Sequence, residues 1–243
     1  MRDQLLDLTK QLRLAGMAQA LDRELDLAQE QGLPVSQTLL NLLQEELRHR
    51  GERSILYRIK EAKMPWSWSL ASFPFGRQPS VSKARIMELA GLEFLNSFKN
   101  ILFIGPTGVG KTGLAMGLLR EALMAGKKGR FYRAQDLLDE LYASLADNSS
   151  PKLFKHLARL DILVIDEVGY LTMNREQCNA FFKLMDERYG KKSTIITTNL
   201  ELDQWYDLFK TKHMVDALLD RLRHHCITIP IDGPSLREPD HND

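Results

Sequence analysis

The chain has 243 residues, enough for one large domain or for a core domain with a small appendage. Its hydrophobic content of 44% and charged content of 27% are ordinary for a globular protein, and no apolar run approaches the roughly 20 residues of a membrane helix. Two cysteines, Cys178 and Cys226, and a start without a signal-peptide pattern predict a cytoplasmic protein without a disulfide framework. The net charge of +1 neither indicates nor excludes a nucleic-acid partner.

Residues 1–64 have the pattern of a small all-α domain that would contact a partner or DNA. Leucines recur at helical spacing from Leu5 onward, and Gly32-Leu33-Pro34 breaks the first run. Leu39, Leu43 and Leu47 then share one helix face, and Gly51 is interpreted as a joint before a third short helix.

Residues 65–82 lose this periodicity, because aromatic residues alternate there with prolines. Such a segment predicts an ordered linker that packs its aromatic rings on a neighbouring element, since disordered linkers are poorer in aromatics. Helix is expected to resume over 83–94, at the start of the second domain, 83–243.

From Asn100 onward, short apolar strands alternate with helices. We expect strands over residues 101–104, 130–133, 162–165, 193–197 and 227–231. Helices are expected after 112 to about 126 and over 137–145, 178–189 and 215–223. This alternation predicts a three-layer α/β/α fold with a five-stranded parallel sheet covered on both faces. The 12 residues after Ile231 are too few for a carboxy-terminal helical lid.

A complete phosphate-binding motif, G-x-x-x-x-G-K-[ST], lies between the first of these strands and its helix. Its glycines let backbone N–H groups converge on phosphates at the helix amino terminus. Lys111 should reach the β- and γ-phosphates of ATP, and the Thr112 hydroxyl should bind Mg²⁺. The residues predicted to contact the nucleotide are Gly105, Pro106, Thr107, Gly108, Val109, Gly110, Lys111, Thr112 and Gly113.

The strand 162–165 ends in two acids that predict the rest of a hydrolytic site. Asp166 would hold Mg²⁺ together with Thr112, and Glu167 would orient the water that attacks the γ-phosphate. Asn199 follows the next strand, where a polar side chain can contact the γ-phosphate or that water, although asparagine is also a common turn residue. Arg221, on a late helix, is either a finger for a neighbouring subunit's site or a surface arginine paired with Asp220.

Together these segments resemble the AAA+ ATPases of the DnaC/IstB type, and specifically the IstB transposition helpers encoded beside the IstA transposase. The resemblance covers essentially the whole chain. The matching stretches are Leu14–Leu21, Phe73–Ser80, Gly105–Thr112, Asp161–Gly169, Ser193–Asn199 with Trp205, Ala217–His225 and Gly233–Arg237.

The resemblance implies an ATP-dependent homo-oligomer with its ATP sites between subunits, which binds duplex DNA without strong sequence preference and directs the transposase to a target. It makes Arg221 the first choice for the trans-acting finger, with Arg223 as its rival. Two positions depart from the family pattern. Gly113 stands where relatives commonly have histidine, and Leu236 replaces an aromatic residue beside Arg237, whose role as a contact to the nucleotide is therefore open.

Three basic runs are candidates for contacts with DNA. The first interleaves with glutamates and is also typical of a solvated helix face. The runs are Arg48, Arg50, Arg53, Arg58, Lys60 and Lys63; Lys127, Lys128, Arg130 and Arg133; and Lys183, Arg188, Lys191 and Lys192. Alternative functions are a DnaC-like loader of a replicative helicase, a nucleotide-gated DNA-binding scaffold with negligible turnover, and, more distantly, a small-molecule kinase.

Overall fold

The computed structural model describes residues 1–146, 149–169, 173–209 and 212–237. By its internal contacts the chain divides into two compact units, residues 1–57 and 58–243. The division falls inside one helix rather than after it. None of the helices in these ranges is long and apolar enough to cross a membrane.

The first unit consists of α1 (Arg2–Gln11), α2 (Ala15–Gln31) and the greater part of α3 (Val35–Glu61). Its small core contains Met17, Leu21 and Leu42. Gly16 lets the start of α2 approach α3 closely, since a Cβ there would lie 2.7 Å from the Glu45 carbonyl oxygen. The Glu46 carboxylate then accepts hydrogen bonds from the N–H groups of Gly16 (2.7 Å) and Met17 (3.1 Å).

One expectation for this unit was wrong. Gly51 is no joint, because α3 is helical without interruption from Val35 to Glu61; a single glycine costs a helix only about 1 kcal/mol, which a long helix tolerates. Leu39, Leu43 and Leu47 do share a helix face, but they are 50%, 46% and 70% exposed. The buried positions of α3 are Thr38, Leu42 and Glu46.

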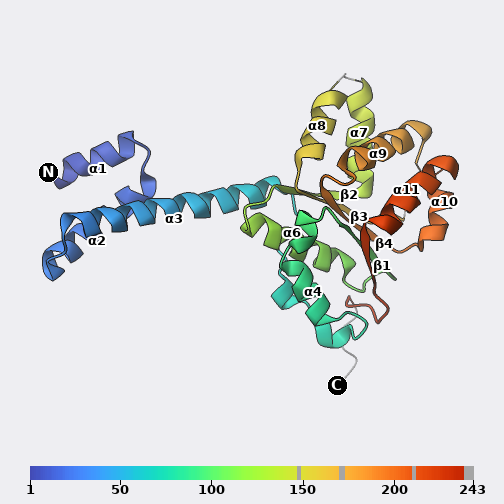
Figure 1. Ribbon diagram of the computed structural model, residues 1–243, viewed down its shortest axis with the longest axis horizontal. Coiled ribbons are helices and arrows are strands. Elements are labelled where there is room, and N and C mark those ends of the chain that lie inside the picture. The colour runs from blue at the N-terminus through green and yellow to red at the C-terminus, as the bar shows by residue number, and fades with distance from the viewer. Residues whose placement is uncertain (147–148, 170–172, 210–211, 238–243) are drawn as a thin grey trace. The chain divides into compact units, whose positions relative to one another are not determined.

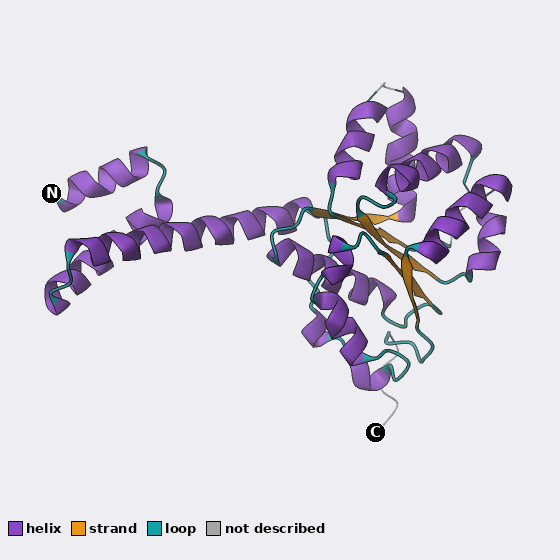
Figure 2. Cartoon of the chain, viewed as in Figure 1, coloured by secondary structure: helices purple, strands orange, loops and turns teal. Residues whose placement is uncertain are grey.

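The second unit is built on a five-stranded parallel sheet of order β2-β3-β4-β1-β5. The strands are β1 (Asn100–Ile104), β2 (Gly129–Arg133), β3 (Ile162–Asp166), β4 (Ser193–Thr198) and β5 (Cys226–Pro230). Every residue of β1, β3 and β4 is buried. This confirms the predicted α/β class and parallel sheet, whose strands Figure 2 shows in orange between layers of helices.

Helices cover both faces of this sheet (Figure 1). One face packs against α4 (Lys83–Ala90), α5 (Glu93–Asn96) and α6 (Lys111–Met124). The other packs against α7 (Ala134–Ala146), α8 (Ser150–Arg159), α9 (Arg175–Arg188), α10 (Trp205–Leu208) and α11 (Lys212–His224). Alternate strand residues divide between the two cores, as the pleat requires; in β1, Phe103 faces the first and Leu102 the second.

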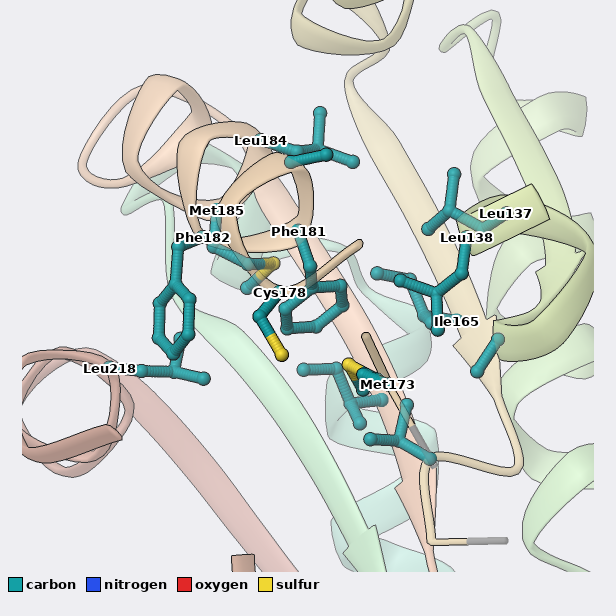
Figure 3. Close-up of a cluster of buried hydrophobic side chains, with 14 of the residues drawn as sticks. Leu137, Leu138, Ile165, Met173, Cys178, Phe181, Phe182, Leu184, Met185 and Leu218 are labelled. Atoms are coloured by element: carbon teal, nitrogen blue, oxygen red, sulfur yellow. The ribbon is translucent and has the colours of Figure 1, made fainter. Parts of the chain in front are cut away.

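The core on the α7–α11 face is rich in aromatic and sulfur-containing side chains. In Figure 3, Phe181 and Cys178 of α9 lie among side chains of α7 and β3. Phe181, Phe182 and Phe209 are in mutual ring contact, with centroids 5.2–6.5 Å apart. This packing anchors α9 and α11 on the sheet.

The segment 65–82 packs some of its aromatic rings on the second unit, whereas Trp66 is 47% exposed. It contains two short 3₁₀ turns, η1 (Leu70–Ser72) and η2 (Phe75–Arg77), and Phe73 is 4% exposed within the core beside α6. After β5, residues 231–237 form no helix and run back over the loop that follows β1. The structure therefore shows no lid helix among the described residues of this segment.

Candidate functional site

The phosphate-binding motif forms the loop between β1 and α6, as predicted. Gly108 and Gly110 have φ angles of 88° and 97°, which glycine adopts without strain. Gly110 precedes the first residue of α6, so the amino terminus of this helix opens into the loop. A phosphate held there would meet backbone N–H groups and the positive end of the helix dipole.

Lys111 and Thr112 stand at the start of α6 and face the strand ends. The Lys111 ammonium donates to the carbonyl oxygens of Gly105 (2.7 Å) and Pro106 (2.6 Å). Burial lowers the pKa of Lys111, and the carboxylates of Asp166 and Glu167 act in the opposite direction. These contacts hold the ammonium against the loop through neutral carbonyl oxygens. Phosphate oxygens would replace them favourably, because a hydrogen bond between an ammonium and an anion is stronger than one to a neutral carbonyl.

Asp166 lies at the carboxyl end of β3, 3% exposed, between two hydroxyls. Thr112 Oγ1 lies 2.9 Å from its Oδ1, and Thr197 Oγ1 lies 2.6 Å from the same atom. Burial raises the pKa of Asp166, while the two hydroxyl donors lower it and Glu167 raises it further. A hydroxyl and a carboxylate side by side are the hard oxygen ligands that Mg²⁺ takes from proteins when phosphates complete its coordination.

Glu167 departs from the strand with a left-handed backbone, φ 63°. Its N–H donates to Thr197 Oγ1 (2.9 Å), so one threonine hydroxyl holds both acids in place. The Glu167 side chain is exposed, in contrast to Asp166. A non-glycine residue at positive φ costs about 1–3 kcal/mol, and such strain gathers at functional sites. Here the left-handed turn at Glu167 leaves its carboxylate exposed, while the adjacent Asp166 carboxylate stays buried.

Asn199 lies beyond β4 with its Oδ1 buried and without a hydrogen-bond partner. Gly169 makes room for this amide, because a Cβ there would lie 2.1 Å from Asn199 Oδ1. Gly169 follows Glu167, the acid predicted to orient water, by two residues. A buried acceptor without a partner costs about 1–3 kcal/mol, and it is available to a water molecule or a ligand.

A cavity of about 270 Å³ joins these groups. It brings together most of the predicted site with residues that the sequence did not indicate. The lining residues are Trp66, Trp68, Thr107, Gly108, Gly110, Lys111, Thr112, Gly113, Glu167, Thr197, Thr198, Asn199, Leu236 and Arg237. Val109 points its side chain into the core instead, and Gly105 packs on the Ile231 carbonyl, so neither lines the cavity. Pro106 and Asp166 are also not among its lining residues.

Trp68 explains the unusual glycine at position 113. A Cβ on Gly113 would lie 2.8 Å from the Trp68 indole, which occupies the space that a histidine would need. The indole Nε1 is buried and has no hydrogen-bond partner. Trp66 also lines the cavity and is 47% exposed. The sequence predicted both tryptophans as part of a linker and not of the site, because their spacing does not show which element they pack against.

The carboxy-terminal segment closes another side of the cavity. Leu236 donates its N–H to the Gly108 carbonyl (2.9 Å), and Gln78 Nε2 donates to the Pro234 carbonyl (2.6 Å). Gln78 is fully buried. These bonds place Arg237 at the cavity beside Lys111, whose pKa it lowers.

Arg221 is the one predicted catalytic residue that lies apart from this cavity. On α11, its guanidinium pairs with Asp186 of α9 (2.7 Å) and lies over the Tyr189 ring, 5.7 Å from the centroid. Its side chain is 36% exposed. The expected alternative partner, Asp220, instead lies 3.6 Å from His224. The side chain of Arg223, its rival, lies outside the described residues.

Comparison with known proteins identifies the family of the chain. The family model described as "IstB-like ATP binding protein" matches residues 7–242. The chain is 35% identical to the "Insertion sequence IS21 putative ATP-binding protein" of Pseudomonas aeruginosa, over 95% of this chain and 87% of that protein. It is 36% identical to the similarly named IS232 protein of Bacillus thuringiensis subsp. berliner, over 95% of this chain and 92% of the relative.

Solved structures identify the fold. A crystal structure of the DnaC helicase loader matches 70% of this chain and 100% of its own, with a TM-score of 0.58 and 24% identity. The replication initiator DnaA bound to AMPPCP and single-stranded DNA matches 69% of this chain and 50% of its own, with a TM-score of 0.59 and 19% identity. The second unit therefore has the AAA+ fold, and the chain belongs to the IstB-like family of ATP-binding proteins.

Proposed function

We propose that the protein is an ATPase that assembles on duplex DNA and assists the transposase of its own insertion sequence. The observation that carries the proposal is the convergence of Lys111, the Thr112–Asp166 pair and Glu167 on one cavity. Membership of the family supports ATP as the nucleotide. The names of the relatives support the link to an insertion sequence.

The triphosphate would lie in the loop at the start of α6. Lys111 would exchange its two carbonyl partners for β- and γ-phosphate oxygens, and Thr112 and Asp166 would hold Mg²⁺. Mg²⁺, when bound, neutralises charge on these phosphates. The purine would lie at the other end of the cavity, against Trp66 and the free N–H of Trp68.

Hydrolysis needs a water molecule directed at the γ-phosphate. The exposed Glu167 carboxylate would accept a hydrogen bond from that water. The oxygen of the water would attack the γ-phosphorus, and the bond between that phosphorus and the bridging β-phosphate oxygen would break. The unpartnered Oδ1 of Asn199 would hold the same water from a second direction. Thr197, which bonds to both Asp166 and Glu167, would position the acids.

Arg221 would complete the site of a neighbouring subunit. Arg221 does not line the nucleotide cavity of its own subunit. Its guanidinium is partly exposed and is held by Asp186 at the surface of α9 and α11. An arginine that approaches the γ-phosphate from another subunit makes hydrolysis depend on assembly. Bound ATP would then join subunits on DNA.

The test is the rate of ATP hydrolysis with and without duplex DNA, for the wild-type protein and Glu167→Gln. We expect duplex DNA to raise wild-type turnover, and Glu167→Gln to lose at least about 100-fold in turnover with its ATP affinity kept. A wild-type protein that binds ATP but shows no turnover with DNA would favour a nucleotide-gated scaffold. Wild-type turnover in Glu167→Gln would remove this residue from the mechanism.

A further inference from the structure

The amino-terminal edge of the sheet, opposite to the nucleotide cavity, carries a row of lysines. Lys99 precedes β1, Lys127 and Lys128 precede β2, and Lys191 and Lys192 precede β4. The order β2-β3-β4-β1 makes these strands neighbours, although the residues are far apart in the sequence. We call these five residues the lysine row. Three spacings of about 4.8 Å between strands give it a length of roughly 14 Å.

Contacts around Asp161, which precedes β3, hold the middle of the row together. The Asp161 carboxylate accepts from the Lys128 N–H (2.9 Å) and pairs with the Lys192 ammonium (2.6 Å). Its own N–H donates to the Lys128 carbonyl. Lys127, Lys192 and Asp161 line one hollow of about 240 Å³ together with the exposed Phe98. Backbone bonds therefore fix the positions from which these side chains extend.

The row keeps an excess of positive charge. Lys99, Lys128 and Lys191 are exposed and make no salt bridge among the residues that the structure describes. Asp161 is the only acid that lines the hollow, and Lys192 already pairs with it. Burial raises the pKa of Asp161, but the Lys128 N–H, Lys192 and Lys127 together bring it below its usual value. The ammonium groups of Lys99, Lys128 and Lys191 are therefore left for an anionic partner.

Several of the other basic residues that were candidates for DNA contacts are paired with acids or buried. In the first run, Arg48 pairs with Glu45 and Glu52, and Arg50 pairs with Glu46. Arg188 was wrongly predicted as a DNA contact, because it is 1% exposed and donates to the carbonyls of Leu157, Leu160 and Ser193.

The residues of the second and third runs also lie in different parts of the second unit. Arg133 lies at the opposite end of β2 from Lys128, at the carboxyl edge of the sheet. Lys183, on α9, lies over the Phe154 ring, 4.6 Å from its centroid. Only the lysines of these two runs that precede strands meet at one edge.

We propose that the lysine row binds the phosphate backbone of duplex DNA. Duplex DNA carries one negative charge for about every 1.7 Å of its axis, so a row of this length faces several phosphates. Lysine is depleted at protein–protein interfaces, where arginine and aromatic residues are enriched, and this favours DNA over an acidic protein surface. The inference rests on the proposed DNA binding and names the residues that perform it.

The experiment compares two triple variants of the full chain that remove the same charge. Lys99→Gln, Lys128→Gln and Lys191→Gln remove three exposed lysines of the row and leave the pair of Lys192 with Asp161 intact. The matched control is Lys152→Gln, Lys155→Gln and Arg159→Gln, on the exposed face of α8. Binding of a labelled duplex of about three helical turns is followed by fluorescence anisotropy over a range of salt concentrations, with ATP affinity measured in parallel.

We expect the row variant to lose roughly two orders of magnitude in duplex affinity near 0.1 M salt. The slope of log affinity against log salt should become shallower by about 2.7, because each phosphate that a lysine neutralises adds about 0.9 to it. The control should keep the wild-type slope, and all three proteins should bind ATP equally well.

Equal losses of affinity in both variants would show an effect of net charge alone and overturn the inference. So would a row variant that binds DNA normally but no longer binds the transposase, because the surface would then serve a protein partner. If the wild-type protein itself binds no duplex, the proposed function fails rather than the assignment of the row.

Discussion

The two edges of the sheet carry their polar residues in opposite ways. At the carboxyl edge, the buried Asp166 accepts hydrogen bonds from the Thr112 and Thr197 hydroxyls. At the amino edge, Lys99, Lys128 and Lys191 extend into solvent without ion pairs among the described residues. The first arrangement fixes atoms to within a hydrogen bond, whereas the second fixes only the backbone positions from which flexible side chains start.

This difference matches what each proposed partner, ATP and duplex DNA, requires. Phosphoryl transfer needs groups held in a defined geometry, and misplacement by about 1 Å can cost about 100-fold in rate. Contact with a phosphate backbone without sequence preference needs charge at a suitable spacing and little geometric precision. One sheet thus presents a structured site at one edge and a simple charged surface at the other, and variants at each edge should have separable effects.

The largest separable effect is expected for Lys111→Ala. It removes the ammonium that faces the phosphates, so ATP affinity should fall beyond detection in a fluorescent-nucleotide titration. Without nucleotide, its duplex affinity and salt slope should equal those of the wild-type protein, because the lysine row is intact. Unchanged ATP affinity would contradict the assignment of the loop, and a changed nucleotide-free salt slope would contradict the separation of the two edges.

Arg221→Ala should bind ATP and duplex DNA but lose about 10³-fold or more in ATP turnover. Mixing it with Lys111→Ala should restore part of the activity, since an Arg221→Ala subunit still supplies a complete loop and a Lys111→Ala subunit still supplies the arginine. Turnover measured across mixing ratios checks this, with each variant alone as the control. If activity stays absent at every ratio, Arg221 does not act between subunits.

A smaller effect is expected for Gly113→His, the residue common in relatives. Its side chain would collide with the Trp68 indole, which lies within 3.0 Å of a Cβ at this position. We expect ATP affinity to fall about 10-fold, by the 1–3 kcal/mol typical of overpacking. Adding Trp68→Ala should recover part of this affinity, and duplex affinity without nucleotide should not change. A Gly113→His protein with normal ATP affinity would show that Trp68 does not shape the nucleotide site.

How far the sequence predicted this arrangement depended on the range of the contacts involved. The strands and the loop at 105–112 were predictable because continuous apolar runs and a motif of eight residues are local signals. The exposure of Leu43 was not predictable, since helical spacing shows which residues share a face but not which face finds a partner. Helix α8 was not predicted, because only Phe154 and Leu157 of its ten residues are buried, too short an apolar pattern to indicate a helix.

The site residues also divide into those with a local sequence signal and those that depend on distant contacts. Lys111, Thr112, Asp166 and Glu167 came from contiguous motifs; the structure brings Lys111, Thr112 and Glu167 to one cavity and holds Asp166 against Thr112. The part played by Thr197 depends on its hydrogen bonds to residues about 30 positions away, so the only signal was a hydroxyl at a strand end. The lysine row depends on strand order, which no local pattern contains.

The central claim is that ATP at one edge and duplex DNA at the other together assemble the protein. Sedimentation velocity tests it most directly, with Glu167→Gln used to slow hydrolysis and samples containing ATP, a duplex of defined length, both or neither. The account predicts a single large complex of defined mass only when both are present, and its absence in Lys111→Ala. Sedimentation of Glu167→Gln as the same species under all four conditions would contradict the account.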